Sequence, residues 1–228
     1  MYETTASRTR SQAADISDYL AIHAMIRRST RAFAIAASST GVLDRRRAVA
    51  LDRYWKGYAG ELHTHHTVED EIFMPALAER VPAVAPYIGR VDGDHHELDL
   101  LIEAGHAAFG ALYAGSNGDE VAEIMWALDR LMTEHLDFED DDIIPLFGRH
   151  FDQDEYDALH ARAIKVVGVG RQALFTVPFC ARWIDTATWT HLYDSAPLPL
   201  KVIYRTTRRR HERLTLLALG DAAREATP

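Results

Sequence analysis

Apolar residues recur with the period of an amphipathic helix along most of the first 150 positions of the chain. Residues 15–38 show this pattern, with Ile16, Leu20 and Ile26 on one face. A run of Ser, Thr and Gly residues follows and ends the segment. The pattern therefore predicts a first long helix over residues 15–38.

Three further helices are predicted. The second should run over residues 44–73, where Pro75 stops or kinks it. The third should occupy residues 82–113, because a Gly-Ser-Asn-Gly turn follows it. The fourth should run over residues 119–144, where Pro145 breaks it. No convincing alternating strand pattern interrupts these segments.

Four long helices with short connections indicate an all-α protein with an up-down-up-down four-helix bundle over residues 15–150. Residues 151–228 are predicted to form a helical C-terminal extension. It begins with a short helix over 152–167, continues through an aromatic-rich stretch and ends in an arginine-rich helix over 202–219.

Two roles remain open for this extension. It packs its apolar face on the bundle or on a second subunit, or it lies on a membrane surface through its basic and aromatic residues. We favour the first, and expect residues 170–219 to be the contact region of a homo-oligomer or protein partner.

A repeated motif carries the candidate chemistry. His65 is followed four residues later by Glu69, and His135 by Glu139, seventy positions further on. A proline stands six residues after each glutamate. Because positions i and i+4 share a helix face, each copy presents one imidazole and one carboxylate together.

The repeat includes the other two helices. His23 in the first helix and His95 in the third are both followed three residues later by an aliphatic residue. The chain therefore looks like two copies of one helix pair, each supplying two imidazoles and one carboxylate. This mixed nitrogen and oxygen set suits iron, manganese or zinc, and the carboxylates could bridge two ions.

Adjacent histidines leave a choice at two positions. We prefer His65 to His66 because Glu69 lies four residues after His65. We prefer His95 to His96 because Leu98 then matches the aliphatic residue after His23. His63 and His66 are expected at the surface or behind the ligands, and a carboxylate such as Glu61, Asp70 or Asp94 should support a ligating histidine.

Composition limits the function. The chain has 228 residues and a net charge of -9, so we expect no nucleic-acid binding. A single cysteine, Cys180, suits a reducing compartment. No segment resembles a signal peptide or a membrane span of about 18 apolar residues. We expect a soluble cytoplasmic protein without membrane contact.

With these motifs, residues 15–150 resemble the hemerythrin-like, HHE cation-binding proteins. The resemblance implies a four-helix bundle with a non-haem centre of two iron ions. The ligands that it implies are the residues already singled out, namely His23, His65, Glu69, His95, His135 and Glu139.

The chain departs from the oxygen-carrying hemerythrins at one position. Those proteins have a further histidine four residues after the third-helix histidine, where this chain has Asp99. The departure argues against a simple reversible oxygen carrier and leaves a coordination position for Asp99, water or a tyrosinate. Tyr58 is the candidate tyrosine, and it either approaches the metals or packs in the core.

Two classes of function follow. The first is a di-iron protein that binds or reacts with dioxygen, nitric oxide or peroxide, with peroxide disproportionation as a candidate catalase-like reaction. The second is a non-catalytic iron-responsive or iron-holding module that acts through a protein partner. A ferritin-like site is a poorer interpretation, because it needs two Glu-x-x-His motifs and the bundle contains only Glu103 with His106.

Overall fold

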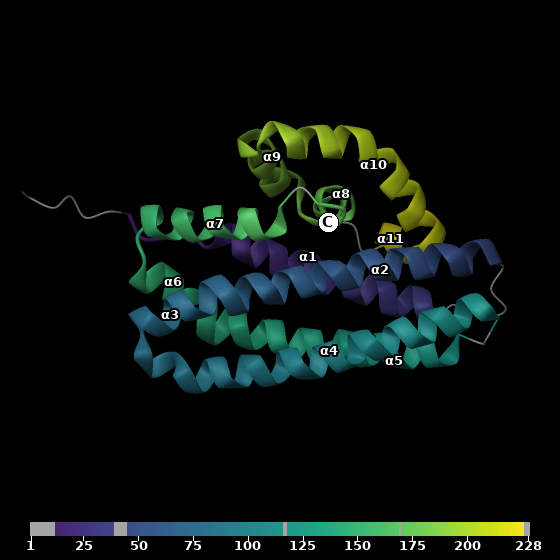
Figure 1. The fold of residues 1–228 in the computed structure, drawn as a ribbon, viewed down its shortest axis with the longest axis horizontal. Coiled ribbons are helices and arrows are strands. Elements are labelled where there is room, and N and C mark those ends of the chain that lie inside the picture. The colour runs from purple at the N-terminus through teal and green to yellow at the C-terminus, as the bar shows by residue number, and fades with distance from the viewer. Residues whose placement is uncertain (1–11, 39–44, 116–117, 169, 226–228) are drawn as a thin grey trace, which may run out of the picture.

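The computed structural model describes residues 12–38, 45–115, 118–168 and 170–225, and these are almost entirely helical. The predicted all-α class is confirmed. The four longest helices of the first 150 residues lie side by side, and successive ones run in opposite directions (Figure 1). α5 packs against both α1 and α4, and α2 packs against α4. The four are α1 (Ser17–Ser38), α2 (Arg45–Val68), α4 (Ala85–Ala114) and α5 (Asp119–Phe138).

Both helices that carry the His-x-x-x-Glu motif change type at the glutamate. α2 passes into the π-helical segment η1 (Glu69–Phe73) and then into α3 (Met74–Arg80). α5 passes in the same way into η3 (Glu139–Ile143) and α6 (Ile144–His150). The expectation that the second proline breaks the helix was wrong, because the chain stays helical beyond both prolines.

The π-helical turn explains how the helix continues. Proline lacks an N–H group, and its ring collides with the carbonyl one α-helical turn earlier. Here the N–H of Met74 donates to the carbonyl of Glu69, and the N–H of Ile144 donates to that of Glu139. This wider spacing is that of a π-bulge, a feature that recurs at functional sites.

The apolar core of the described residues falls into two clusters. Leu62 of α2 and Met132 of α5 belong to the first. Ile72 and Ile143, in the two π-helical segments, belong to the second. The motif residues lie between these positions on both helices, so a polar layer separates the two apolar clusters.

The C-terminal extension is helical, as expected. α7 begins at the residue after the N-cap Asp152, whose side chain forms a reciprocal capping box with Glu155. The last long helix begins four residues earlier than its apolar pattern predicted. The short 3₁₀ turn η2 (Pro82–Val84) precedes α4, and the extension comprises α7 (Gln153–Val167), α8 (Ala173–Trp183), α9 (Thr186–Ser195), α10 (Leu198–Leu219) and α11 (Ala222–Glu225).

α8 completes the first core cluster. Phe179 and Trp183 are fully buried there, and the indole N–H of Trp183 donates to the Tyr54 hydroxyl at 3.1 Å. Arg28 of α1 donates to the carbonyl of Trp183 at 2.6 Å. The extension therefore packs its apolar face on α1 and α2. No helix in the described ranges is both long and apolar enough to cross a bilayer.

Candidate metal centre

The polar layer between the two core clusters contains the six residues that the repeat predicted as ligands. Five of them are buried, and the side chain of His65 is only 9% exposed. They come from all four long helices and their π-helical continuations: His23, His65, Glu69, His95, His135 and Glu139.

These residues form two overlapping groups of candidate metal ligands. One group joins His23 and His65 to the two glutamates, and the other joins His95 and His135 to the same glutamates. Within each group the ligand atoms all lie within 4.8 Å of one another. Both groups contain Glu69 and Glu139, so the two carboxylates stand between two pairs of imidazoles.

The two oxygens of Glu69 face different histidine pairs. Its Oε1 lies 3.3 Å from Nε2 of His65 and 3.6 Å from Nε2 of His23. Its Oε2 lies 3.6 Å from Nε2 of His95. Glu139 Oε2 is 3.6 Å from Nε2 of His23 and 3.5 Å from Nε2 of His135. A carboxylate in such a position can bridge two cations.

Several buried polar atoms of the site have no hydrogen-bond partner, and they indicate whether cations fit there. Such atoms cost about 1–3 kcal/mol each when nothing satisfies them. A cation among them would satisfy imidazole nitrogen and carboxylate oxygen together, and this donor set suits iron, manganese or zinc. Unpartnered atoms here are Nε2 of His23, His65, His95 and His135, Oε2 of Glu69 and both carboxylate oxygens of Glu139.

Aspartates lie beside the other ring nitrogen of three of these histidines, and two of the three are hydrogen-bonded to it. Nδ1 of His23 lies 2.6 Å from Asp140, and Nδ1 of His95 lies 2.9 Å from Asp70. Nδ1 of His135 is 3.5 Å from Asp94, a contact that is not a hydrogen bond. A carboxylate at Nδ1 accepts its proton and leaves the lone pair of Nε2 directed into the site, as in metal-bound histidines.

The electrostatics of the layer also favour a cation. Burial lowers the pKa of His65 to about 3, so its imidazole is neutral at physiological pH. Burial and the neighbouring Glu69 raise the pKa of Glu139 well above its usual range. Although burial opposes it, His65 and His23 hold the pKa of Glu69 well below the usual range. Two adjacent buried carboxylates ionise together only if positive charge is placed between them.

The comparison with protein families decides what this arrangement is. The family model of the hemerythrin HHE cation-binding domain matches residues 14–160, which is more than half of the chain. This chain belongs to the hemerythrin HHE cation-binding family. The comparisons with curated proteins and with solved structures gave no significant match. Membership of the HHE family indicates cation binding, and the His/Glu groups described above are where this chain could hold the cation.

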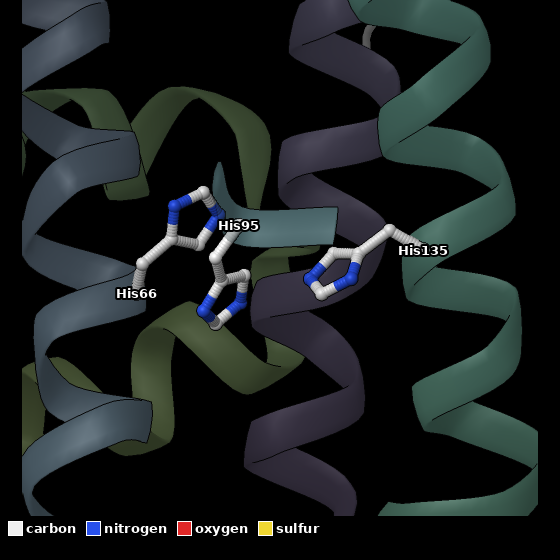
Figure 2. Close-up of side chains that lie close together, drawn as sticks. All are labelled: His66, His95 and His135. Atoms are coloured by element: carbon white, nitrogen blue, oxygen red, sulfur yellow. The ribbon is translucent and has the colours of Figure 1, made fainter. Parts of the chain in front are cut away.

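His66 adds an imidazole that the sequence analysis did not include among the candidate ligands. It was expected at the surface or behind the ligands, but only 4% of it is exposed and both ring nitrogens lack a hydrogen-bond partner. With His95 and His135 it forms a third group of candidate ligands. Figure 2 shows the three imidazoles converging, with that of His95 between the other two. The His66 and His95 rings are stacked with centroids 4.2 Å apart.

The sequence did contain a signal for His66. Its counterpart in the second copy of the HHE motif repeat is Leu136, which is fully buried. A buried residue at the equivalent position indicates that both face the interior. Tyr19 was also missed; its hydroxyl donates to Oε1 of Glu69 at 2.6 Å. Its signal was its place one helical turn before His23.

The two additional ligands considered from sequence do not join the described groups. Tyr58 is fully buried, but its hydroxyl is hydrogen-bonded to Thr30, and its ring packs against Phe33 and Phe179. Asp99 is exposed on α4. The three groups of candidate ligands among the described residues include neither Tyr58 nor Asp99.

One cavity reaches the HHE site from the side of α7. It has a volume of about 180 Å³. Tyr19, His65 and Glu69 contribute to its wall, and Val68 and Phe73 make part of it apolar. The cavity thus reaches His65 and Glu69 of the site, and His66 is not among the described residues that line it.

Proposed function

We propose that this chain is a non-haem di-iron protein that binds or reacts with dioxygen, nitric oxide or peroxide. The observation that carries the proposal is the sharing of Glu69 and Glu139 by two histidine pairs. A single-metal site would need only one of these pairs. In this proposal residues 15–150 act as the up-down-up-down four-helix bundle of the family, with residues 151–228 as its extension.

The two iron sites differ in the number of imidazoles. We assign His23 and His65 to one ion and His95 and His135 to the other, with Glu69 and Glu139 between them. His66 adds a third imidazole to the second ion. It would take the place of the further histidine that the oxygen carriers have four residues after the third-helix histidine, where this chain has Asp99. The first ion then has fewer protein ligands, and it lies on the side that the cavity reaches.

The cavity limits what can arrive. About 180 Å³ accommodates a small oxidant but is below the usual 300–1,000 Å³ of pockets for larger organic ligands. The apolar part of its wall suits dioxygen and nitric oxide. Iron, when bound, supplies electrons and open coordination positions for such a molecule.

The chain's own residues keep the site ordered. Asp140 and Asp70 fix the tautomers of His23 and His95. Burial and the nearby Glu69 raise the pKa of the Tyr19 hydroxyl, so it keeps its proton and continues to donate to that carboxylate. The two core clusters on either side exclude bulk water from the layer.

Metal analysis tests the proposal most directly. Protein expressed with iron should contain about two irons per chain, as a two-metal site requires. Glu69→Gln and Glu139→Gln should each reduce the iron content, because a bridging carboxylate is lost. Glu71→Gln is the matched control, since Glu71 is an exposed residue of the same π-helical segment. One zinc and no iron would contradict the proposal.

Reactivity is tested on the iron-loaded protein. An absorption band of an oxo-bridged iron pair that changes on addition of azide or peroxide would support an open site. Oxygen release from peroxide would support disproportionation if it is lost in Glu69→Gln and Glu139→Gln and kept in Glu71→Gln. Oxygen release that persists in both bridging variants would exclude this site as its source.

A further inference from the structure

A groove lined by arginines lies between α2 and α10. It has a volume of about 850 Å³ and lies toward the N-terminal end of α2. The chain as a whole is acidic, with a net charge of -9, so this concentration of positive charge is local. Six arginines line the groove, three from each helix: Arg45, Arg46, Arg53, Arg209, Arg210 and Arg213.

These arginines are not neutralised within the described part of the protein. All six are exposed, no acidic residue is among the described residues that line the groove, and no ion pair joins the six to a described carboxylate. Arg45 and Arg46 also occupy the first turn of α2, which has no acidic residue. The helix dipole disfavours cations at that position. An anion bound in the groove would relieve this repulsion.

The floor of the groove is apolar. Val49 and Ala50 of α2 face Leu214 and Leu217 of α10 across it. Guanidinium groups bind phosphate through paired N–H donors and also stack on flat rings. Charged walls above an apolar floor suit a ligand with several phosphates and an apolar or aromatic part.

We propose that this groove binds a small polyanion of the nucleoside polyphosphate class. Its volume lies in the range of pockets for organic ligands of that size. The groove is hollowed between two helices, whereas a flat membrane or a nucleic acid would contact a wider surface. An acidic chain also repels such extended polyanions.

The groove is separate from the metal centre. Arg53 and His65 are twelve residues apart on α2, a rise of about 18 Å along a helix. The proposal therefore goes beyond the iron chemistry. Iron content can serve as a check that variants of the groove are folded.

Calorimetric titration of the iron-loaded protein with ATP, and separately with inorganic tripolyphosphate, tests the proposal. ATP should bind saturably and more tightly than tripolyphosphate, because only ATP can use the apolar floor. Arg209→Gln with Arg213→Gln should weaken ATP binding more than tenfold, and Arg46→Gln with Arg53→Gln should do the same from the other wall. Binding should weaken as salt is raised.

The matched control is Arg162→Gln with Arg171→Gln, which removes the same charge from exposed positions outside the groove. It should change ATP affinity less than twofold. Equal losses in control and groove variants, or no saturable binding at low salt, would overturn the proposal. So would binding to phosphatidylglycerol vesicles or duplex DNA through the same arginines with no competition by ATP, because the occupant would then be a membrane or a nucleic acid.

Discussion

Asp140 lies 2.6 Å from Nδ1 of His23, although 117 positions separate the two residues in the chain. The reciprocal pair is Asp70 and His95, 2.9 Å apart. Each aspartate directly follows a motif glutamate and supports a histidine from the other copy of the repeat. Neither half of the repeat is therefore complete without the other.

Asp140→Asn is expected to weaken iron binding about 10- to 100-fold, the usual effect of losing a carboxylate behind a ligating histidine. The amide cannot fix the His23 tautomer as firmly as the carboxylate does. Competition with a chelator of known affinity measures the change.

Asp141→Asn is the control for this variant, because Asp141 is the next residue and its side chain is exposed. It should leave iron affinity unchanged. Similar losses in both variants would mean that general charge, not the contact with His23, sets the affinity.

The sequence predicted the helices and the six residues that meet in the candidate site, because both depend on periodicity that one chain displays. His66 was not predicted to be a candidate ligand, because the choice between His65 and His66 depended only on the residue four positions later, which is Asp70 for His66. The apolar counterpart Leu136 in the second copy of the repeat was not considered. Asp140 could not be matched to His23 because that contact depends on how α1 and η3 pack, which local spacing does not encode.

Tyr19→Phe should destabilise the protein by about 1–3 kcal/mol, because a buried oxygen of Glu69 loses its charge-assisted donor. Denaturant unfolding of the metal-free protein measures this loss. Tyr87→Phe, at a ring that is 43% exposed, should change stability much less. Equal stability of wild type and Tyr19→Phe would show that this hydrogen bond contributes little.

Two glycines of α4 should respond in opposite ways to alanine. A Cβ at Gly105 would lie 2.3 Å from the indole of Trp55, whereas one at Gly110 would meet nothing within 4 Å. Gly105→Ala should cost about 1–3 kcal/mol through overpacking. Gly110→Ala should be neutral or stabilising by up to about 1 kcal/mol, because alanine favours the helix. Thermal unfolding compares the two, and a stable Gly105→Ala would contradict the close approach of α2 and α4.

We expect His211 to make a contribution to the free energy of unfolding that is lost in acid. Burial, with a smaller effect of Arg182, lowers its pKa from the ordinary 6.5 to about 4. Between these values the unfolded chain binds a proton that the folded chain does not, so the contribution is present above pH 6.5 and is lost as pH falls to 4. The full loss is about 3 kcal/mol.

The variant His211→Gln isolates this effect. Unfolding free energies of the metal-free wild type and variant should converge as pH falls from 6.5 to 4, because only the wild type loses the His211 contribution. A constant difference over this range would show that His211 does not titrate on unfolding.

The role of the extension was open from sequence because its aromatic residues suited several surfaces. Trp183 and Phe179 are buried against α1 and α2, so this part of the extension packs on the bundle, while contact with a partner through residues 170–219 stays a prediction. The close approach depends on Gly57, where a Cβ would lie 2.2 Å from the ring of Phe175. From the sequence alone, a glycine in the middle of a helix does not show which side chain packs against it.

The two π-helical turns have a consequence for local opening. Each turn begins at a buried glutamate, and the two glutamates lie close together in both groups of candidate ligands. Without a cation the turns hold buried carboxyl groups whose oxygens lack hydrogen-bond partners, so their backbone should open readily. Iron held between Glu69 and Glu139 would fasten both turns at once. Amide hydrogen exchange should then slow over residues 69–74 and 139–144 on iron loading, while exchange in α8 and α10 stays nearly unchanged.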